Sequence, residues 1–291
     1  MKIKNLKGTK SKRNIKAVSP AISTVILTSA IVVLLLVTIV FANNFLSARM
    51  TENEFSAMKQ FMQTVALQID DVAWIPGRVQ TIRYASKYGH VSLEYGSRGM
   101  RGENGTLIYR VYILEGSNYK SFANFSTSII LFNVPVSSYS LGNNYYERIF
   151  PSSGSFLQKG ASAPVSHVFV VEKLPMDDGN YIRIVVAPCI RVLNSTLGTT
   201  KYFRFFLPIL VPGSSPRLSQ SVTLASRSVS VKTGVCNAVR ITVDFSRESF
   251  QKGFNENFFK FEQITEFFDV PDGSVIEFYT GTVVVSLGLH G

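Results

Sequence analysis

Histidine and cysteine are scarce in this chain of 291 residues, which has three of the first and two of the second. His90, His167 and His290 lie far apart, and none has a cysteine, histidine or carboxylate at the spacing of metal ligands. The chain also lacks a Gly-x-Ser-x-Gly nucleophile motif, a phosphate-binding P-loop and a glycine-rich dinucleotide fingerprint. We therefore predict a protein that is not an enzyme and has no catalytic residues, no metal and no cofactor.

Charge is absent from one long stretch, because no charged residue occurs between Ala17 and Ala48. An uncharged apolar segment longer than about 18 residues is long enough to cross the hydrocarbon core of a bilayer as a helix. Residues 1–16 contain seven basic residues and no acidic one, a flank that stays in the cytoplasm. We predict a membrane-spanning segment at about 20–42, with the chain from Arg49 onward exported to the outside of the cell.

The beginning of the apolar helix has its own signal. Ser19 is a good N-cap residue, and Pro20 follows it at the first helical position, where a missing N–H costs nothing. A secretory signal peptide has a shorter apolar region, of about 7 to 15 residues, and is cut after it at small residues. A cut of that kind before Asn43 remains the alternative.

These residues resemble a known family. A basic leader, then Ala-Val-Ser-Pro-Ala-Ile-Ser-Thr-Val-Ile and a long apolar helix, is similar to the N-terminal region of archaeal type IV pilin-like proteins. The resemblance covers about residues 12–48. It implies that a prepilin peptidase cuts between Ala17 and Val18, removing residues 1–17, and that the helix is kept to pack with other pilin subunits in a homo- or heteropolymer. The processing site on this pattern comprises Lys16, Ala17, Val18, Ser19 and Pro20.

The sequence departs from the family pattern at one position. Many pilins carry a glutamate five residues into the mature chain, where it pairs with the terminal amine of a neighbouring subunit. Here that residue is Ile22. A filament built from this chain would therefore depend on helix packing alone.

The helix is predicted to continue beyond the membrane, over residues 18–73 in all. Its apolar residues recur at alternating steps of three and four, which is typical of an amphipathic helix: Phe55, Met58, Met62, Val65, Ile69 and Val72. Pro76 and Gly77 predict its end. The apolar stripe either covers the core of the exported domain or packs against other subunits.

Residues 74–291 are predicted to form a β-rich head. Short segments rich in β-branched and aromatic residues indicate strands at 79–84, 91–95, 107–114, 128–133, 165–172, 181–187, 203–210, 221–224, 238–245 and 274–279. Asp-Gly pairs at 178–179 and 272–273 favour tight turns. The expected fold class is α+β, a long N-terminal helix followed by an antiparallel β-sandwich.

Two other segments of the head have distinctive patterns. Phe250, Phe254, Phe258, Phe261 and Phe268 recur at near-helical steps, which predicts a helix over 250–268 that lays its phenylalanines on the sheet or binds a partner. Residues 212–216, Pro-Gly-Ser-Ser-Pro, are either a linker between two parts of the head or a long loop.

The net charge of +11 does not indicate nucleic-acid binding. All 19 acidic residues follow Ala48, together with 23 of the 30 basic ones, so the exported part has a net charge of only +4. The basic excess belongs to the leader, where it sets membrane topology.

The exported part contains candidates for covalent modification. Cys189 and Cys236 are the only cysteines, and outside the cell they either form a disulfide or remain two separate buried thiols. Asn104, Asn124 and Asn194 each begin an Asn-x-Ser/Thr sequence and are candidate N-glycosylation sites on a cell-surface protein.

Two functions fit these observations. The first is a subunit of an extracellular type IV pilus-like filament, with its helix in the filament core and its head exposed for adhesion. The second is a membrane-anchored receptor with an uncleaved signal anchor, whose head binds a surface or carbohydrate ligand. Tyr139, Tyr145 and Tyr146 would suit sugar stacking in the second case, although packing within the head is the alternative for them.

Overall fold

The structure is a computed structural model that describes residues 20–96, 105–214 and 220–288. The chain divides into two compact units, Met1–Arg49 and Met50–Gly291. Helix α1 (Pro20–Ala73) begins in the first unit and ends in the second. Pro20 is the first described residue and is helical, whereas the other processing-site residues, Lys16 to Ser19, lie outside the described ranges. The head unit begins within the helix, because side chains from Thr51 onward are buried in it.

The larger sheet of the head has eight strands in the order β4-β3-β12-β13-β11-β10-β7, with β1 paired to β12. Two of its pairs are parallel, β11 with β13 and β10 with β7. The prediction of an entirely antiparallel head is therefore wrong at these two pairs. The strands are β1 (Val79–Arg83), β3 (Leu107–Glu115), β4 (Asn118–Thr127), β7 (Leu157–Lys159), β10 (Ile190–Leu197), β11 (Thr200–Pro212), β12 (Ser221–Phe245) and β13 (Thr265–Leu287).

The smaller sheet has five antiparallel strands in the order β2-β5-β9-β8-β6. They are β2 (His90–Glu94), β5 (Ile129–Pro135), β6 (Tyr145–Phe150), β8 (Ser166–Glu172) and β9 (Tyr181–Pro188). The three central strands, β5, β9 and β8, are buried on both faces along nearly their whole length. This sheet must therefore be covered on each side.

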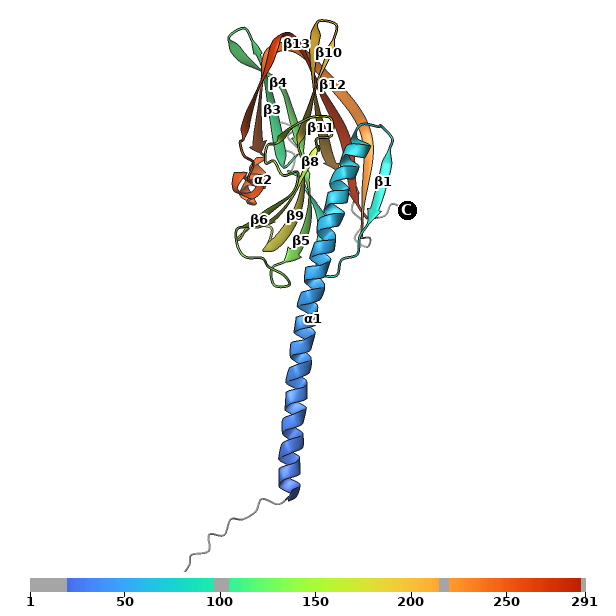
Figure 1. Cartoon of the computed structure of the whole chain (residues 1–291), viewed down its shortest axis with the longest axis vertical. Helices are drawn as coiled ribbons and strands as arrows, with labels where there is room; N and C mark the ends of the chain where they lie inside the picture. Colours follow the sequence, from blue (N-terminus) through green and yellow to red (C-terminus); the bar gives the residue numbers. More distant parts are fainter. Residues whose placement is uncertain (1–19, 97–104, 215–219, 289–291) are drawn as a thin grey trace, which may run out of the picture. The chain divides into compact units, whose positions relative to one another are not determined.

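Two hydrophobic cores cover the two faces of the smaller sheet. One face, with Leu131, Phe169 and Val185, packs against residues of β3, β11, β12 and β13 in the larger sheet. The opposite face, with Phe132, Val170 and Ile184, packs against the second half of α1 and the ends of β11, β12 and β13. The head therefore has a β-β-α layering, which Figure 1 shows with the last turns of α1 beside the strands.

The end of α1 is set by backbone geometry. The helix stops at Ala73, and Gly77 has a φ of 85°, as the Pro76-Gly77 pair predicts. A Cβ atom on Gly281 of β13 would collide with the carbonyl oxygen of Ala73. Only glycine lets β13 approach the last turn of the helix this closely.

The strand predictions are confirmed for most segments and incomplete for others. The structure adds β4, β6, β7 and β10, whose sequences contain asparagine, glutamate, serine or lysine and so lack a strong strand pattern. Residues 221–224 and 238–245 belong to one strand, β12, of 25 residues. The predicted turn at 271–273 is wrong, because these residues form an irregularity within β13, between the pairs Ala238–Asp269 and Cys236–Ser274.

The turn at 177–180 does join two antiparallel strands, β8 and β9, but it is not tight. Strand β8 ends at Glu172 and β9 begins at Tyr181, which leaves residues 173–180 as the connection. Arg183, which is fully buried, donates from Nη2 to Asp178 Oδ1 at 2.6 Å and to the Gly179 carbonyl at 3.3 Å. The loop is long because it folds back over this guanidinium.

The predicted helix over 250–268 is wrong as a single element. The segment contains α2 (Arg247–Gln251) and α3 (Glu256–Phe259), and β13 has begun by residue 265. Gly253 has a φ of 100° and Lys260 a φ of 47°, conformations that interrupt a right-handed helix. The expectation that the phenylalanines cover the sheet is confirmed for Phe254 and Phe258, which are buried in the core between the sheets.

The segment 212–216 connects β11 and β12, and both of these strands pair with β13 in one sheet. The connection therefore lies within the head unit, although residues 215–219 themselves lie outside the described ranges.

Candidate functional site

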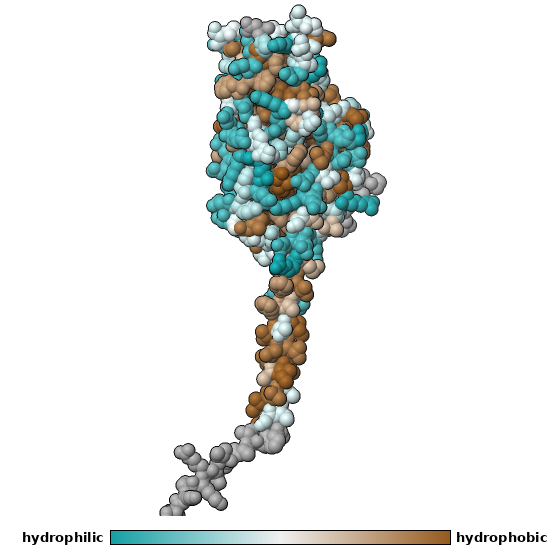
Figure 2. All heavy atoms as spheres, viewed as in Figure 1, coloured by the Kyte–Doolittle hydropathy of each residue, from teal (hydrophilic) through white to brown (hydrophobic). Residues whose placement is uncertain are grey.

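The first half of α1 has an apolar surface on all sides. Every described side chain from Ile22 to Met50 is exposed, and Leu34 and Phe41 have 68% and 71% of their surface accessible. Figure 2 shows this segment as an almost continuous hydrophobic surface. Within the described residues, α1 is the one helix long and apolar enough to cross a membrane. A helix that is apolar all round is stable only in lipid or against other protein.

Several hydroxyl side chains of this segment bond to their own helix. Ser29 Oγ donates to the Val25 carbonyl at 2.7 Å, and Thr38 Oγ1 donates to the Leu34 carbonyl at 2.8 Å. Such bonds satisfy a hydroxyl without water. These hydroxyl groups can therefore lie in lipid or in a protein interior without an unsatisfied hydrogen-bond donor.

The second half of α1 is built into the head. The six residues of the predicted apolar stripe, Phe55 to Val72, are each at most 2% exposed, so the prediction that the stripe covers the core of the head is confirmed. The polar side chains of this half also bind the head. The Glu54 carboxylate accepts hydrogen bonds from Ser86 Oγ at 2.5 Å and from the backbone N–H groups of Lys87 and Tyr88.

The far end of this half is held by the half-buried carboxylate of Asp70. Asp70 accepts from Trp74 Nε1 and from Arg191 Nη1, each at 2.8 Å. The Arg191 side chain is 12% exposed and that of Asp70 is 32% exposed, so the pair is partly shielded from water. The helix and the head are therefore one cooperative structure from Thr51 to Ala73.

The histidines are not grouped with other potential ligands. His90 lies on β2, where burial lowers its pKa, and His290 lies outside the described residues. His167 on β8 has a pKa of about 4, because burial disfavours its charged form and the Arg148 cation adds to the shift. No group of three histidine, cysteine, aspartate or glutamate side chains is placed to hold a metal in the described part of the chain.

The two cysteines are both free and buried. The disulfide considered for Cys189 and Cys236 is not formed in this structure, which has the alternative of separate thiols. Cys189 follows β9 and hydrogen bonds to the Pro164 carbonyl, whereas Cys236 lies on β12 opposite Ser274. Burial raises the pKa of Cys189.

Two of the three candidate glycosylation sites can be located. Asn124 on β4 and Asn194 on β10 are exposed strand residues, so an enzyme could reach both side chains. Asn104 lies outside the described residues.

The three tyrosines considered for sugar stacking pack against the head. The Tyr139 ring lies 5.1 Å from Phe55, and the Tyr146 ring lies 5.4 Å from Phe169. Tyr145 donates its hydroxyl to Glu147 Oε2 at 3.0 Å. The packing alternative for these residues is the one that the structure shows.

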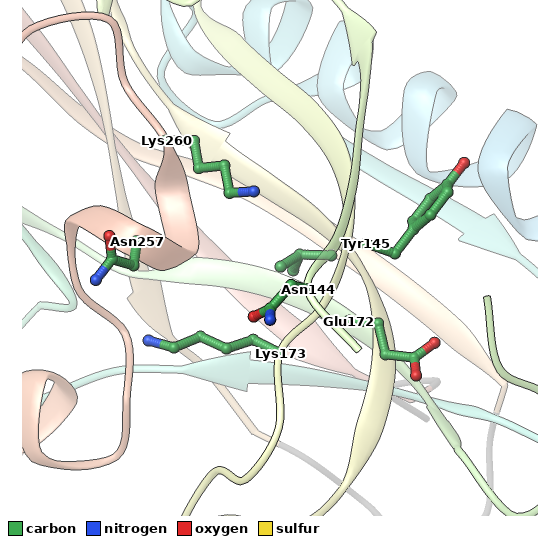
Figure 3. Close-up of a pocket in the computed structure, with 7 residues that line it drawn as sticks. Asn144, Tyr145, Glu172, Lys173, Asn257 and Lys260 are labelled. Carbon is green, nitrogen blue, oxygen red and sulfur yellow. The ribbon is translucent and has the colours of Figure 1, made fainter. Parts of the chain in front are cut away.

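A separate polar cleft lies where β6, β8 and α3 meet. It has a volume of about 300 Å³ and is lined by Asn144, Tyr145, Val171, Glu172, Lys173, Asn257 and Lys260. Figure 3 shows Lys173, Lys260, Asn144 and Asn257 around it, while Glu172 and Tyr145 point away from the two lysines. The Glu172 carboxylate is occupied, because it accepts from Ser140 Oγ and from two backbone N–H groups.

The cleft was not found from the sequence. Its residues come from three segments more than 25 positions apart, and none of these segments has a recognisable motif. One unusual local feature lies at Lys260. This residue ends α3 in the left-handed conformation, a position where glycine is usual, but this became visible only once the structure had placed the end of the helix.

The chain was compared with protein-family models, with curated proteins and with solved structures. None of them matches it.

Proposed function

We propose that the chain is a type IV pilin-like subunit of a cell-surface filament. In this proposal a prepilin peptidase removes residues 1–17, the helix packs with other pilin subunits in the filament core, and the β head is exposed outside the cell for adhesion. The resemblance of residues 12–48 to archaeal pilin-like proteins and the basic leader support it.

The single observation that carries the proposal is the contrast along α1. Residues 22–50 are exposed on every side, although more than half of them are large and apolar, whereas the continuation of the same helix is buried in the head. An anchor that remains in lipid needs an apolar surface of about 20 residues. A subunit that leaves lipid for a filament needs the same surface to be covered by copies of itself. Both requirements are met by a helix with no polar face.

The test is the N-terminal residue and the intact mass of the protein recovered from native cell surfaces. The proposal expects a chain that begins at Val18, with the helix retained. A chain that begins at Met1 would instead support the membrane-anchored receptor, and a chain that begins at Asn43 would show that the helix serves only export.

The processing step gives a second test. Replacing Ala17 and Val18 by glutamates places charges at the cleavage site, and we expect an unprocessed precursor that stays in the membrane and forms no filaments. The matched control is Asn43→Glu with Asn44→Glu, which adds the same charge beyond the apolar core. Normal filaments from the Ala17/Val18 variant would contradict the proposal.

A further inference from the structure

We propose that the polar cleft of the head is a binding site for a sugar that bears a carboxylate, such as a uronic acid. The cleft is the site defined above by Asn144, Lys173, Asn257 and Lys260 with the backbone around them. This inference concerns the head alone, and it holds for a filament subunit and for an anchored receptor alike.

The first argument is the charge of the cleft. Lys173 donates from Nζ to the Gly253 carbonyl and to Asn255 Oδ1, both at 2.9 Å, so one of its three donors remains for a ligand. Burial lowers the pKa of this ammonium, so a bound anion would relieve its desolvation. Lys260 Nζ lies 5.0 Å from the centre of the Tyr146 ring, and its side chain has no hydrogen bond in the structure.

The lining acid does not cancel these charges. Glu172 is 1% exposed, and its carboxylate oxygens already accept three hydrogen bonds from the 140–142 segment. Most of its acceptor capacity is therefore used within the head, and it faces away from the two ammonium groups in Figure 3. The free polar groups of the cleft match an anion.

The second argument is the size of the cleft and the presence of two amides. A volume of about 300 Å³ corresponds to roughly ten waters, which is more than a bare carboxylate fills. It is at the lower end for small-molecule sites, large enough for one sugar ring. The side chains of Asn144 and Asn257 make no hydrogen bonds in the structure and can each donate and accept, which suits neighbouring hydroxyl groups.

The third argument is the backbone of the lining residues. Asn144, with a φ of 66°, and Lys260, with a φ of 47°, are the non-glycine residues with positive φ in the described part of the chain, and both line this cleft. For lysine this conformation is strained, because its Cβ lies close to the backbone, and glycine would avoid the strain. Residues in rare backbone conformations cluster at binding sites. We infer that the strained backbone at residue 260 is tolerated because the lysine side chain contributes to ligand binding.

The cleft is also held in shape before any ligand binds. Tyr146 donates its hydroxyl to the Phe259 carbonyl at 3.0 Å, and Arg148 donates from Nη2 to the Lys260 carbonyl at 3.1 Å. On the other side, Lys173 holds the N-cap residue of α3, Asn255. The helix that presents Asn257 and Lys260 is thus fastened at both ends, which lowers the entropy lost on binding.

The test measures binding of sodium glucuronate to the full chain in detergent micelles, by calorimetry and by saturation-transfer NMR. We expect glucuronate to bind at millimolar concentrations, and glucose and acetate to bind at least roughly tenfold more weakly, because each lacks one half of the recognised chemistry. Equal binding of glucose would overturn the role of the lysines. Equal binding of acetate would overturn the assignment to a sugar.

Three variants test whether glucuronate binds at this cleft. Lys260→Gly keeps the left-handed backbone and removes the ammonium, Lys260→Met removes the charge at similar size, and Asn257→Ala removes one amide. We expect each Lys260 variant to weaken glucuronate binding roughly tenfold, and Asn257→Ala to weaken it several-fold. The matched control is Lys201→Met, which makes the same change of net charge at an exposed lysine of β11 outside the cleft.

Two outcomes would overturn the proposal outright. One is the absence of glucuronate binding at about 10 mM, a concentration at which even weak sugar sites are occupied. The other is binding that is unchanged in both Lys260 variants while their thermal unfolding matches that of the original protein. Neither outcome bears on N-terminal processing, so the filament proposal stands or falls separately.

Discussion

The two halves of α1 are both apolar, and they differ in how the apolar residues are arranged. From Ile22 to Met50 every side of the helix is exposed, whereas from Thr51 to Ala73 one stripe is buried against the smaller sheet and the other side is polar. The second half has found its partner within the chain. The first half is exposed along its whole described length, and an apolar surface of this kind is suited to lipid or to another chain. One helix therefore carries two kinds of surface, an exposed apolar one and a buried stripe. The boundary between them lies near residue 50.

The largest expected effect comes from a change that prevents membrane insertion of the first half of α1 and leaves the second half unaltered. Replacing Val33 and Leu36 by arginine places two charges in the middle of the apolar segment, at a combined insertion cost of about 5–7 kcal/mol. We expect the chain to lose its membrane insertion while the unfolding midpoint of the head stays unchanged. Fractionation of membranes and chemical denaturation measure the two properties separately.

The control places the same charges where they cost less. Asn43→Arg with Asn44→Arg lies at the end of the apolar segment, where long basic side chains reach the interface. If the Val33/Leu36 variant remained inserted like this control, the first half would not be a membrane segment.

The second prediction concerns the buried apolar stripe in the second half of α1. Phe55 is 2% exposed, and Phe55→Ala is expected to destabilise the head by about 3–5 kcal/mol, through lost burial and a cavity between α1 and the smaller sheet. Fluorescence of the single tryptophan, Trp74, follows unfolding at the end of the helix. Leu67, which is 57% exposed on the same helix, is the control, and Leu67→Ala should change stability by less than about 0.5 kcal/mol. Equal effects would contradict the stripe.

The third prediction extends the comparison to pH. The first half has no histidine or carboxylate, whereas the head contains His167, whose pKa of about 4 lies below the ordinary 6.5. As the pH falls below 6.5, the unfolded chain binds a proton that the folded chain does not. Stability is therefore lost from about pH 6.5 down to pH 4, by about 3 kcal/mol at most, and the loss from this group stops below pH 4.

The variant His167→Gln isolates this effect from the titration of carboxylates. Its free energy of unfolding should fall less than that of the original protein between pH 7 and pH 4.5, as measured by denaturant titration at each pH. Parallel curves for the two proteins would exclude His167 as a source of acid sensitivity.

The smallest expected effect concerns the end of the helix. Asp70→Asn weakens the hydrogen bonds to Trp74 and Arg191 and is expected to cost about 1–3 kcal/mol, because Arg191 would remain largely buried without a charged partner. The neighbouring Asp71 pairs with Arg78 at the surface, and Asp71→Asn should cost less than about 1 kcal/mol. A reversed order of the two effects would show that the pair of Asp71 with Arg78, not the pair of Asp70 with Arg191, fastens the helix end.

Much of the secondary structure could be predicted because its signals are local. The long helix, its end before Gly77 and many of the strands were readable from neighbouring residues. The Phe250–Phe268 segment shows the limit of such reading. Its phenylalanines recur at helical steps, yet Gly253 and Lys260 divide it, and its last residues pair with β12 as part of β13. Pairing with a distant strand outweighed the local pattern.

By itself, the sequence determined that the chain has a charge-free apolar helix, an amphipathic continuation and a β-rich remainder, since each depends on the order of residues within a few turns or strands. Only the tertiary structure decided that the smaller sheet is the middle layer, that β11 and β13 run parallel, and that Asn144, Lys173, Asn257 and Lys260 share one cleft. The physical reason is that these features arise from contacts between residues far apart in the chain. Such contacts are selected by burial and hydrogen bonding of the whole head, and no local pattern encodes them.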